Sequence, residues 1–253
     1  MADLNSFVES CNRNLQRGDD DCVAALKYLT TERGLSLKSI ALHKLGFCRR
    51  GQDVPGTTRD DLELNVVMHG RVVVPIFAEF GRHVVGVAAR EPDPKAKGWW
   101  NTHFDKQSNL FLFNQSRKII FDRDKAYVFE GYFDGLVLFQ EGLENAVSAM
   151  GTSLGYRRIG LLKRYCNRIC LCYDTDENRA GQDAVVRAIW ELSNFNFAQL
   201  SSVTLPVGVD PDEYVIQHGL EAFLALEHTL ADSEIKTARR DHEQRKRRKE
   251  PAA

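Results

Sequence analysis

Short apolar runs alternate with amphipathic stretches from residue 125 to residue 228. The runs have the length and hydrophobicity of buried strands and comprise Ala126 to Phe129, Ala146 to Ala149, Ile169 to Tyr173 and Val203 to Leu205. Helical spacing is found in Tyr132 to Gln140, Leu161 to Tyr165, Ala180 to Leu192 and Leu220 to Glu227. This alternation is typical of parallel βαβ units covered by helices on both faces. We therefore predict an α/β domain over residues 125–228.

Residues 1–124 follow a different pattern and predict a mixed α+β subdomain. A first helix follows Asp19 to Asp21 and ends at Gly34, and a second is capped by Ser36 and runs from Leu37 to Leu45, where Gly46 stops it. Three predicted antiparallel strands follow, at Leu64 to Met68, Arg71 to Phe77 and His83 to Ala89. Residues 229–253 remain as a basic tail, either helical or disordered.

The overall composition is that of an ordinary soluble globular protein. Of 253 residues, 43% are hydrophobic and 27% charged, and the net charge is −1. No apolar run approaches the roughly 18 residues of a membrane span. The N-terminus has no signal-peptide pattern, so we expect a cytoplasmic location, in bacteria or in a phage-infected cell. Basic residues gather near the C-terminus, at Arg239, Arg240, Arg245, Lys246, Arg247, Arg248 and Lys249. This tail either binds nucleic-acid phosphates or is a solvated helix end.

The six cysteines predict buried, reduced thiols. They form no C-x-x-C pair and lack zinc-ribbon spacing. An intracellular protein keeps such thiols free. Cys170 and Cys172 fall within one predicted strand, and we expect their side chains on opposite faces.

Acidic residues follow three of the predicted parallel strands. They are Glu130, Asp134, Asp174, Asp176, Asp210 and Asp212. Ligands of parallel sheets bind at the carboxyl ends of strands, so these side chains are expected at one edge. Carboxylates that share an edge repel each other unless a cation lies between them, and Mg²⁺ or Mn²⁺ prefers such hard oxygen ligands. We therefore predict a site for two or more divalent ions and phosphate chemistry.

Each motif also has a purely structural interpretation. A single D-x-D turn is most often a solvated loop or a helix cap. The segment Gly151-Thr152-Ser153 either offers backbone donors to phosphate or caps a helix. Trp99 and Trp100 either stack on nucleic-acid bases or pack on their own domain, and packing is the more common case. The ordered series of acids favours the functional interpretation for the carboxylates.

The same residues resemble a known family. Val128 to Asp134, Ala149 to Ser153, Cys172 to Asp176 and Val209 to Tyr214 resemble the Rossmann-like TOPRIM domain of bacterial and phage DnaG-type primases. The likeness extends upstream to the N-terminal part of the primase polymerase core, through Arg33 to Ser36, Leu45 to Phe47, Arg71 to Ile76, Val85 to Arg90, and Lys106 with Leu110 to Phe113. It covers roughly residues 20 to 228.

The resemblance implies DNA-templated synthesis of short RNA primers by a nucleotidyltransferase. Glu130, Asp174 and Asp176 would be catalytic, and these three with Asp134, Asp210 and Asp212 would hold Mg²⁺ or Mn²⁺. Arg33, Arg90 and Lys106 would contact nucleotide phosphates or the template. The implied partners are single-stranded DNA and ribonucleoside triphosphates, with a replicative helicase or a zinc-bearing protein in trans as further candidates.

The chain also departs from the family pattern. No cysteine–histidine set can build the zinc ribbon of cellular primases, and we expect neither zinc nor a helicase-binding domain. We therefore expect a minimal primase core from a phage or mobile element, in which the basic tail replaces some DNA contacts. Two alternatives stay open: a TOPRIM nuclease, which uses the same carboxylates, and a non-catalytic subunit that binds DNA or a helicase.

Overall fold

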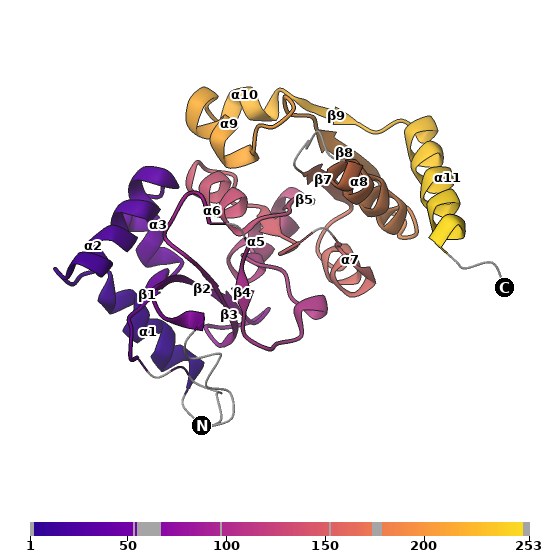
Figure 1. Cartoon of the computed structure of the whole chain (residues 1–253). Coiled ribbons are helices and arrows are strands. Elements are labelled where there is room, and N and C mark those ends of the chain that lie inside the picture. Colours follow the sequence, from indigo (N-terminus) through magenta and orange to yellow (C-terminus); the bar gives the residue numbers. More distant parts are fainter. Residues whose placement is uncertain are drawn as a thin grey trace. The chain divides into compact units, whose positions relative to one another are not determined.

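The chain forms two compact units, residues 1–104 and 105–253. The computed structural model (Figure 1) describes residues 3–52, 54, 67–96, 98–151, 153–173 and 179–249, without the side chains of 179–183 and 247–249. The segment 105–124, which the sequence places with the N-terminal subdomain, contributes Leu110, Phe113 and Ile120 to the core of the second unit. None of the helices in the described ranges is both long enough and apolar enough to cross a membrane.

The first unit opens with helices that follow the sequence signals in part. Its elements are α1 (Leu4–Asn14), α2 (Asp20–Lys27), the π-helix η1 (Tyr28–Glu32) and α3 (Leu37–Leu42). Ser36 caps α3 as predicted, because its hydroxyl accepts a hydrogen bond from the Ser39 N–H at 3.1 Å. The prediction that this helix reaches Leu45 is wrong. Gly46 begins a strand instead, and a Cβ there would lie 2.6 Å from Cys11 of α1.

The sheet of the first unit is antiparallel throughout, with the order β1-β2-β3-β4. Its strands are β1 (Gly46–Cys48), β2 (Arg71–Phe77), β3 (Val84–Arg90) and β4 (Trp100–Asn101). The predictions for β2 and β3 are confirmed, whereas β1 and β4 are too short to show a period in the sequence. The predicted strand at Leu64 to Met68 is wrong where the structure describes it. Val67 and Met68 are helical, and Met68 is buried beside Phe7.

The sheet of the second unit confirms the predicted α/β architecture. Its strands are β5 (Lys125–Phe129), β6 (Ala146–Ser148), β7 (Arg168–Cys172), β8 (Gln199–Val203) and β9 (Glu227–Thr229), in the order β6-β5-β7-β8-β9. The first four pair in parallel, with Val128 opposite both Val147 and Leu171. The predicted helix end at Glu227 is wrong, because this residue begins β9, which pairs antiparallel to β8.

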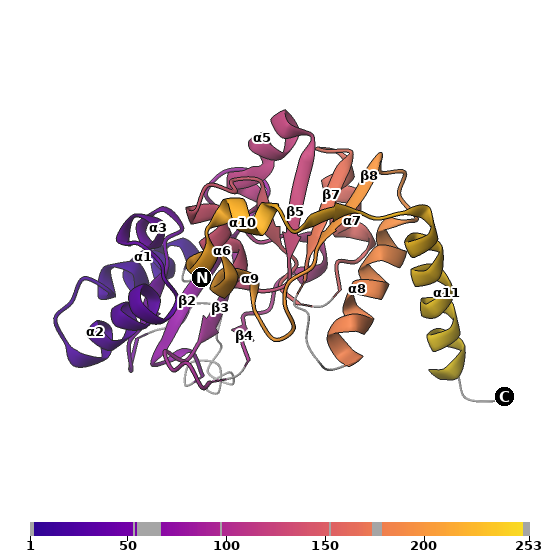
Figure 2. The ribbon, with the colours of Figure 1, turned by 90° about the horizontal axis from the view of Figure 1, so that it is seen from above.

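Helices cover both faces of this sheet (Figure 2). One core lies against α5 (Phe113–Arg123), α7 (Tyr156–Lys163), α8 (Arg179–Leu192) and α11 (Asp232–Lys249). The other core lies against α6 (Tyr132–Gln140), α9 (Pro211–His218) and α10 (Leu220–Leu224). The short 3-10 helix η3 (Lys106–Ser108) leads into the unit. The strands are apolar on both sides because each face is buried.

All six cysteines are buried and free, as predicted. The expectation that Cys170 and Cys172 point to opposite faces is wrong. Both thiols lie in the core beside Phe129, with their sulfur atoms 3.9 Å apart. Residues two positions apart in a strand share a face, since successive side chains alternate.

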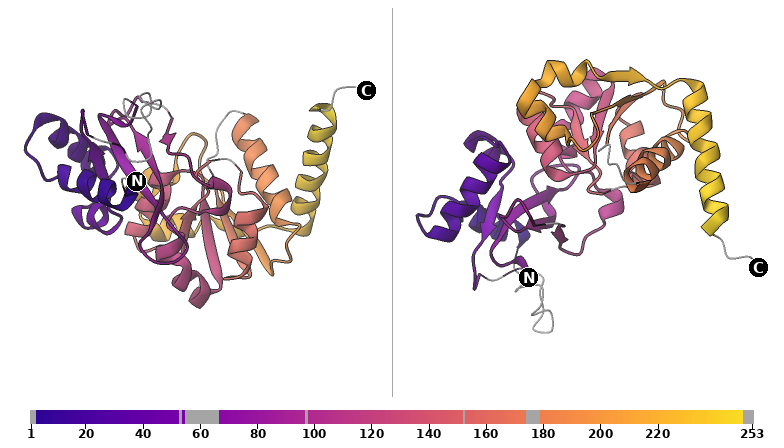
Figure 3. Two further views of the ribbon diagram at one scale, coloured as in Figure 1. Left: turned by 90° about the horizontal axis from the view of Figure 1, so that it is seen from below. Right: turned by 45° about the horizontal axis from the view of Figure 1, so that its top comes forward.

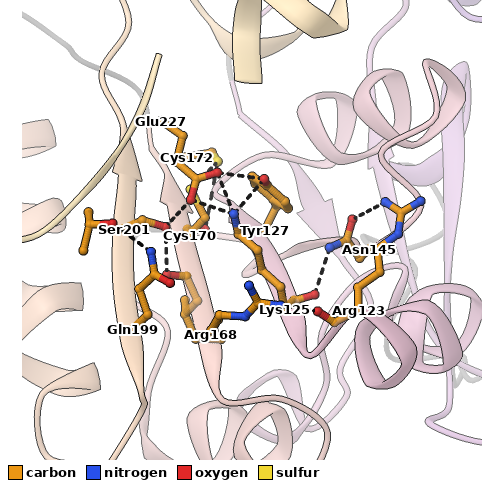
Figure 4. Close-up of polar contacts among 12 residues, drawn as sticks. Arg123, Lys125, Tyr127, Asn145, Arg168, Cys170, Cys172, Gln199, Ser201 and Glu227 are labelled. Atoms are coloured by element: carbon orange, nitrogen blue, oxygen red, sulfur yellow. Dashed lines mark hydrogen bonds and ion pairs between the residues drawn. The ribbon is translucent and has the colours of Figure 1, made fainter. Parts of the chain in front are cut away.

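A partly buried ion pair holds β9 on the sheet (Figure 4). The ammonium of Lys125 in β5 donates to both oxygens of Glu227 in β9, at 2.6 Å each. The hydroxyls of Tyr127 and Ser201 donate to the same carboxylate, at 2.8 and 2.6 Å. The side chains of Lys125 and Glu227 are only 19% and 16% exposed. Burial by itself would raise the pKa of Glu227, but these hydrogen bonds outweigh burial and hold that pKa below its ordinary value.

Replacing Lys125 by methionine tests how far this ion pair stabilises the second unit. Removing one partner leaves a charge without its counter-ion, so we expect a loss of about 2–4 kcal/mol in the free energy of unfolding measured with urea. The loss is present above the ordinary carboxyl pKa of about 4.3 and shrinks as the pH falls through the lowered pKa of Glu227. Exposed Lys118→Met is the control. Equal effects of the two variants at neutral pH would contradict this account.

Candidate functional site

Glu130 lies at the carboxyl end of β5. Its side chain is partly buried and follows Phe129, the last residue of the strand. The loop after β6 is fastened to this end, because the N–H of Ala149 donates to the Phe129 carbonyl and that of Gly151 donates to the Glu130 carbonyl, at 2.8 and 3.1 Å. The position of Glu130 at the sheet edge is therefore set by β5 and by the loop after β6.

Asp134 has a structural role in the first turn of α6. It is 7% exposed, and its carboxylate accepts a hydrogen bond from the N–H of Gly131 at 3.1 Å. This bond satisfies one of the donors that a helix start leaves open, and the negative charge suits the helix dipole. A Cβ at position 131 would collide with the Asp134 carboxylate, so glycine is required there for this contact.

Asp210 and Asp212 belong to the start of α9. Asp210 is the exposed N-cap residue and Pro211 is the first helical residue. Asp212 is 4% exposed, and its carboxylate accepts a bond from the Glu213 N–H at 2.9 Å. The helix packs against α6, which begins beside Glu130. The D-P-D segment is thus a helix start as well as a candidate ligand set.

Asp174 and Asp176 lie outside the described residues, which end at Tyr173 and resume at Arg179. The register of the strands places the last described residue before them. Phe129 is paired with Cys172, so Glu130 and Tyr173 leave adjacent strands at the same level.

The described part of the site suits a hard cation in its donor chemistry. Tyr173 is buried, and its hydroxyl has no hydrogen-bond partner within the described ranges. Burial, followed by the nearby charge of Glu130, raises the pKa of this phenol. An unpartnered buried hydroxyl leaves an oxygen atom for a further ligand. Within the same ranges, no three acidic, histidine or cysteine side chains come together as a metal group.

Buried Arg158 ties Lys106 to the loop after β6. Its guanidinium donates to the carbonyls of Lys106 and Asn109, at 2.9 Å each from Nε, and to the carbonyl of Ser153 at 2.9 Å from Nη1. The residue is 5% exposed. Lys106 itself is partly buried, and burial followed by the charge of Arg158 lowers its pKa. The sequence analysis missed Arg158, because the pair Arg157-Arg158 has the appearance of surface charge.

Glu191 of α8 also bonds to this loop. Its carboxylate accepts bonds from the Gly155 N–H at 2.8 Å, from the Ser153 hydroxyl at 3.3 Å and from Arg187 at 3.0 Å. The residue is 3% exposed. A signal for it exists in the sequence, since Glu191 falls on the buried helical stripe of Ala184, Ala188 and Leu192. The loop 151–155 is thereby held between two buried charges. Thr152 lies outside the described residues.

Arg33 and Arg90 lie in the first unit. The Arg33 guanidinium donates to the Tyr28 hydroxyl at 2.9 Å and lies over that ring. The Arg90 guanidinium donates to the Ala96 carbonyl at 2.7 Å and lies 5.7 Å from the centre of the Trp99 ring. Trp99 therefore packs within its own unit, whereas Trp100 in β4 is 50% exposed.

The basic tail is helical in its described part, within α11. Arg239 donates to the hydroxyl and carbonyl of Ser193 and so fastens α11 to the end of α8. Arg240 lies 3.8 Å from Asp241, and Lys246 is exposed. Arg245 is partly exposed, and the side chains of Arg247, Arg248 and Lys249 lie outside the description. Arg239 thus bonds to α8, whereas Lys246 is exposed to solvent.

Substitution of Asp134 tests its role as a helix cap through the free energy of unfolding. Asp134→Ala removes the acceptor for the Gly131 N–H and should lower the free energy of unfolding by about 1 kcal/mol. Asp134→Asn keeps an acceptor oxygen and should stay within about 0.5 kcal/mol of the parent chain. Urea titrations measure both. Equal losses in the two variants would show that the negative charge, rather than the hydrogen bond, stabilises the helix.

Comparison with known proteins places this geometry in one family. Residues 127–215 match a family model described as Toprim-like. The chain is 40% identical over 228 residues to a DNA primase of Enterococcus faecalis, covering 79% of the chain and 36% of the relative. It is 31% identical over 246 residues to a DNA primase of Listeria innocua, covering 88% and 39%. The chain thus spans less than two fifths of the length of these curated relatives.

Solved structures agree with the sequence relatives. The zinc-binding and RNA polymerase domains of Aquifex aeolicus primase superpose with a TM-score of 0.76 at 27% identity, covering 96% of this chain and 64% of that one. A DNA primase domain from Pseudomonas aeruginosa shares the fold, with a TM-score of 0.78 at 24% identity and coverage of 92% and 81%. The site at the end of β5 thus lies in a Toprim-like domain, and the chain belongs to the family of DnaG-type primases.

Proposed function

We propose that this chain is the catalytic core of a DNA primase, which synthesises short RNA primers on single-stranded DNA. The observation that carries the proposal is the position of Glu130 at the carboxyl end of a parallel strand, level with Tyr173 at the end of the neighbouring strand β7, in a primase-family chain. Nucleotidyl transfer needs positioned charges around an in-line phosphoryl centre and little covalent chemistry from the protein. A sheet edge that collects carboxylates supplies such a frame.

The proposed cofactor is Mg²⁺ or Mn²⁺. Glu130, Asp174 and Asp176 would be its principal ligands, with Asp134, Asp210 and Asp212 as further candidates. When bound, divalent ions neutralise the triphosphate and stabilise the attacking and leaving oxygens. Asp134 and Asp212 already accept backbone hydrogen bonds, which orient their carboxylates and favour an indirect contribution by these two residues.

The proposed contacts to nucleotide or template phosphates come from Lys106, Arg33 and Arg90. Lys106 belongs to the second unit, like Glu130. Arg158 fixes the backbone of Lys106 against the loop at the carboxyl edge. A lysine held in this way serves as a point charge for phosphate. Arg33 and Arg90 already lie over aromatic rings, and these contacts restrict their side chains before a ligand arrives.

Single-stranded DNA is the proposed template. A structure named as the DnaG primase catalytic domain bound to ssDNA superposes on this chain with a TM-score of 0.73 at 27% identity, covering 88% of this chain and 78% of that one. The likeness to primases also extends over the first unit, since the Listeria innocua relative covers 88% of the chain. This extent favours primer synthesis over the nuclease activity that the same carboxylates can support.

Primer synthesis is tested with single-stranded DNA, labelled ribonucleotides and Mg²⁺ or Mn²⁺. We expect short RNA products that fall about 100-fold or more in Glu130→Gln and Asp174→Asn, because each removes a metal ligand. Exposed Glu144→Gln is the matched control and should be unchanged. Degraded template would point to a nuclease, and intact binding without either product would point to a non-catalytic module.

The basic end of α11 is a second proposed DNA contact. Replacing Arg240, Arg245 and Lys246 by glutamine should weaken binding and flatten the dependence of affinity on salt by about 0.7 per lost phosphate contact. Arg239 is kept, because it bonds to Ser193. The matched control exchanges lysine and arginine at the three positions and should keep the slope. An unchanged slope in the glutamine variant would contradict the proposal.

A further inference from the structure

The second unit contains a cavity that the proposed active site does not use in full. Its volume is about 930 Å³, within the range of ligand pockets. Lys106 and Gln107, the loop 150–155, the start of α7 and the middle of α8 form its walls. The cavity therefore opens beside the loop that is fastened to Glu130.

The walls of this cavity carry a positive charge. Among the described residues four cations line it, Lys106, Arg157, Arg158 and Arg187, against the single carboxylate of Glu191. That carboxylate already accepts bonds from Arg187 and from the loop. Arg157 is 69% exposed and forms a surface ion pair with Asp105 at 3.3 Å and a hydrogen bond to the Ser108 hydroxyl at 3.4 Å. A surface pair of this kind is weak, so a phosphate can replace it. The ligand expected here is an anion.

An aromatic cluster borders the same cavity. Tyr156 at the start of α7 is 52% exposed and lies edge-on to Trp190 of α8, with ring centres 6.2 Å apart. Trp190 stacks on His242 of α11, with centres 4.1 Å apart and planes at 16°. The Trp190–His242 contact helps to hold α11. The exposed face of the Tyr156 ring takes no part in that contact. It lies next to arginines, and an unpaired base can stack on it.

Helix α11 brings further positive charge to this place. Arg239 bonds to Ser193 and His242 stacks on Trp190, so α11 runs antiparallel to α8. Figure 3 shows the two helices side by side. The chain beyond His242 therefore passes toward the start of α8, which directly follows the D-x-D segment. Arg245 and Lys246 lie on this part of α11. Cations thus extend from Lys106 across α7 and α8 to α11.

We propose that an unpaired DNA strand, the template, binds across this surface. Its phosphates contact Lys106, Arg157 and Arg187, and one base stacks on Tyr156 at the edge of the Trp190–His242 pair. A strand fits better than a single nucleotide, because the cations are spread over three helices and would contact successive phosphates. The one exposed ring would stack on one base of that strand. Duplex DNA offers no free base face for Tyr156. The inference rests on the proposed function, since it assigns the path of the template.

The first test measures stacking by fluorescence anisotropy of a labelled single-stranded oligothymidine bound to the full chain. Tyr156→Ala should weaken binding about five-fold or more, as expected for one lost base–aromatic contact. Tyr156→Phe keeps the ring and should retain the parent affinity. Phe121→Ala removes another exposed aromatic residue of the same unit and should have no effect. Unchanged binding in Tyr156→Ala would overturn the proposal.

The second test measures charge. Arg157→Gln should reduce the slope of log affinity against log salt by about 0.7, whereas Arg157→Lys and exposed Lys118→Gln should leave it unchanged. A ribonucleoside triphosphate is the competing probe. If Tyr156→Ala weakens its binding but leaves the oligonucleotide unaffected, the cavity is a nucleotide site and the strand path is wrong.

These results are separable from the test of primer synthesis. If the parent chain makes no primers while Tyr156→Ala and Arg157→Gln still weaken strand binding, the primase proposal fails and the strand path stands. If the parent makes primers and both variants bind as the parent does, the strand path alone fails. Both substituted side chains are on the surface, so we expect each variant to keep the fold. Thermal unfolding of each variant checks this.

Discussion

The parallel pairing of β5 with β6 and β7 is the constraint on which the second unit depends. Lys125 to Phe129 pair with Arg168 to Cys172 without a break, and the inner residues are buried on both faces. Burying both faces requires helices on each side, and parallel pairing requires those helices as crossovers. Every crossover then starts at the carboxyl edge. Glu130, the loop after β6 and Tyr173 meet there as a consequence of strand order.

Buried charges fasten the chain at both ends of this sheet. At the amino end of β5, Lys125 and Glu227 join residues 102 positions apart and hold the last strand. At the carboxyl edge, Arg158 and Glu191 both bond to the loop after β6. Each of these groups is satisfied by several hydrogen bonds, which is the condition under which a buried charge is tolerated. These bonds fix the described backbone of the loop after β6 at the edge that carries the candidate chemistry.

Some carboxylates of the candidate site also belong to helix starts. Asp134 caps α6 and Asp210 begins α9, so the acids that suggest a metal also suit helix starts. The two uses are compatible, because in parallel α/β sheets the carboxyl ends of strands and the amino ends of helices share an edge. Arg158 and Glu191 position Lys106 and the loop through their hydrogen bonds. The cavity beside them is where we propose that the template strand binds.

The sequence by itself determined the alternation of strands and helices in residues 125–228, including both ends of α6. The strand predicted at Val203 to Leu205 is misplaced, because β8 runs from Gln199 to Val203. The alternation and the ends of α6 are local features, since they follow from hydrophobic period and from residues next to strand ends. Only the tertiary structure decided the features that join distant segments. In the sequence Glu227 has the pattern of a helix end, but in the fold it pairs with Lys125. Arg158 has the pattern of surface charge, but in the fold it bonds to three carbonyls. Hydrogen bonds between positions 50 or 100 residues apart leave no period in the chain, so the partners of these charges became visible only in the fold.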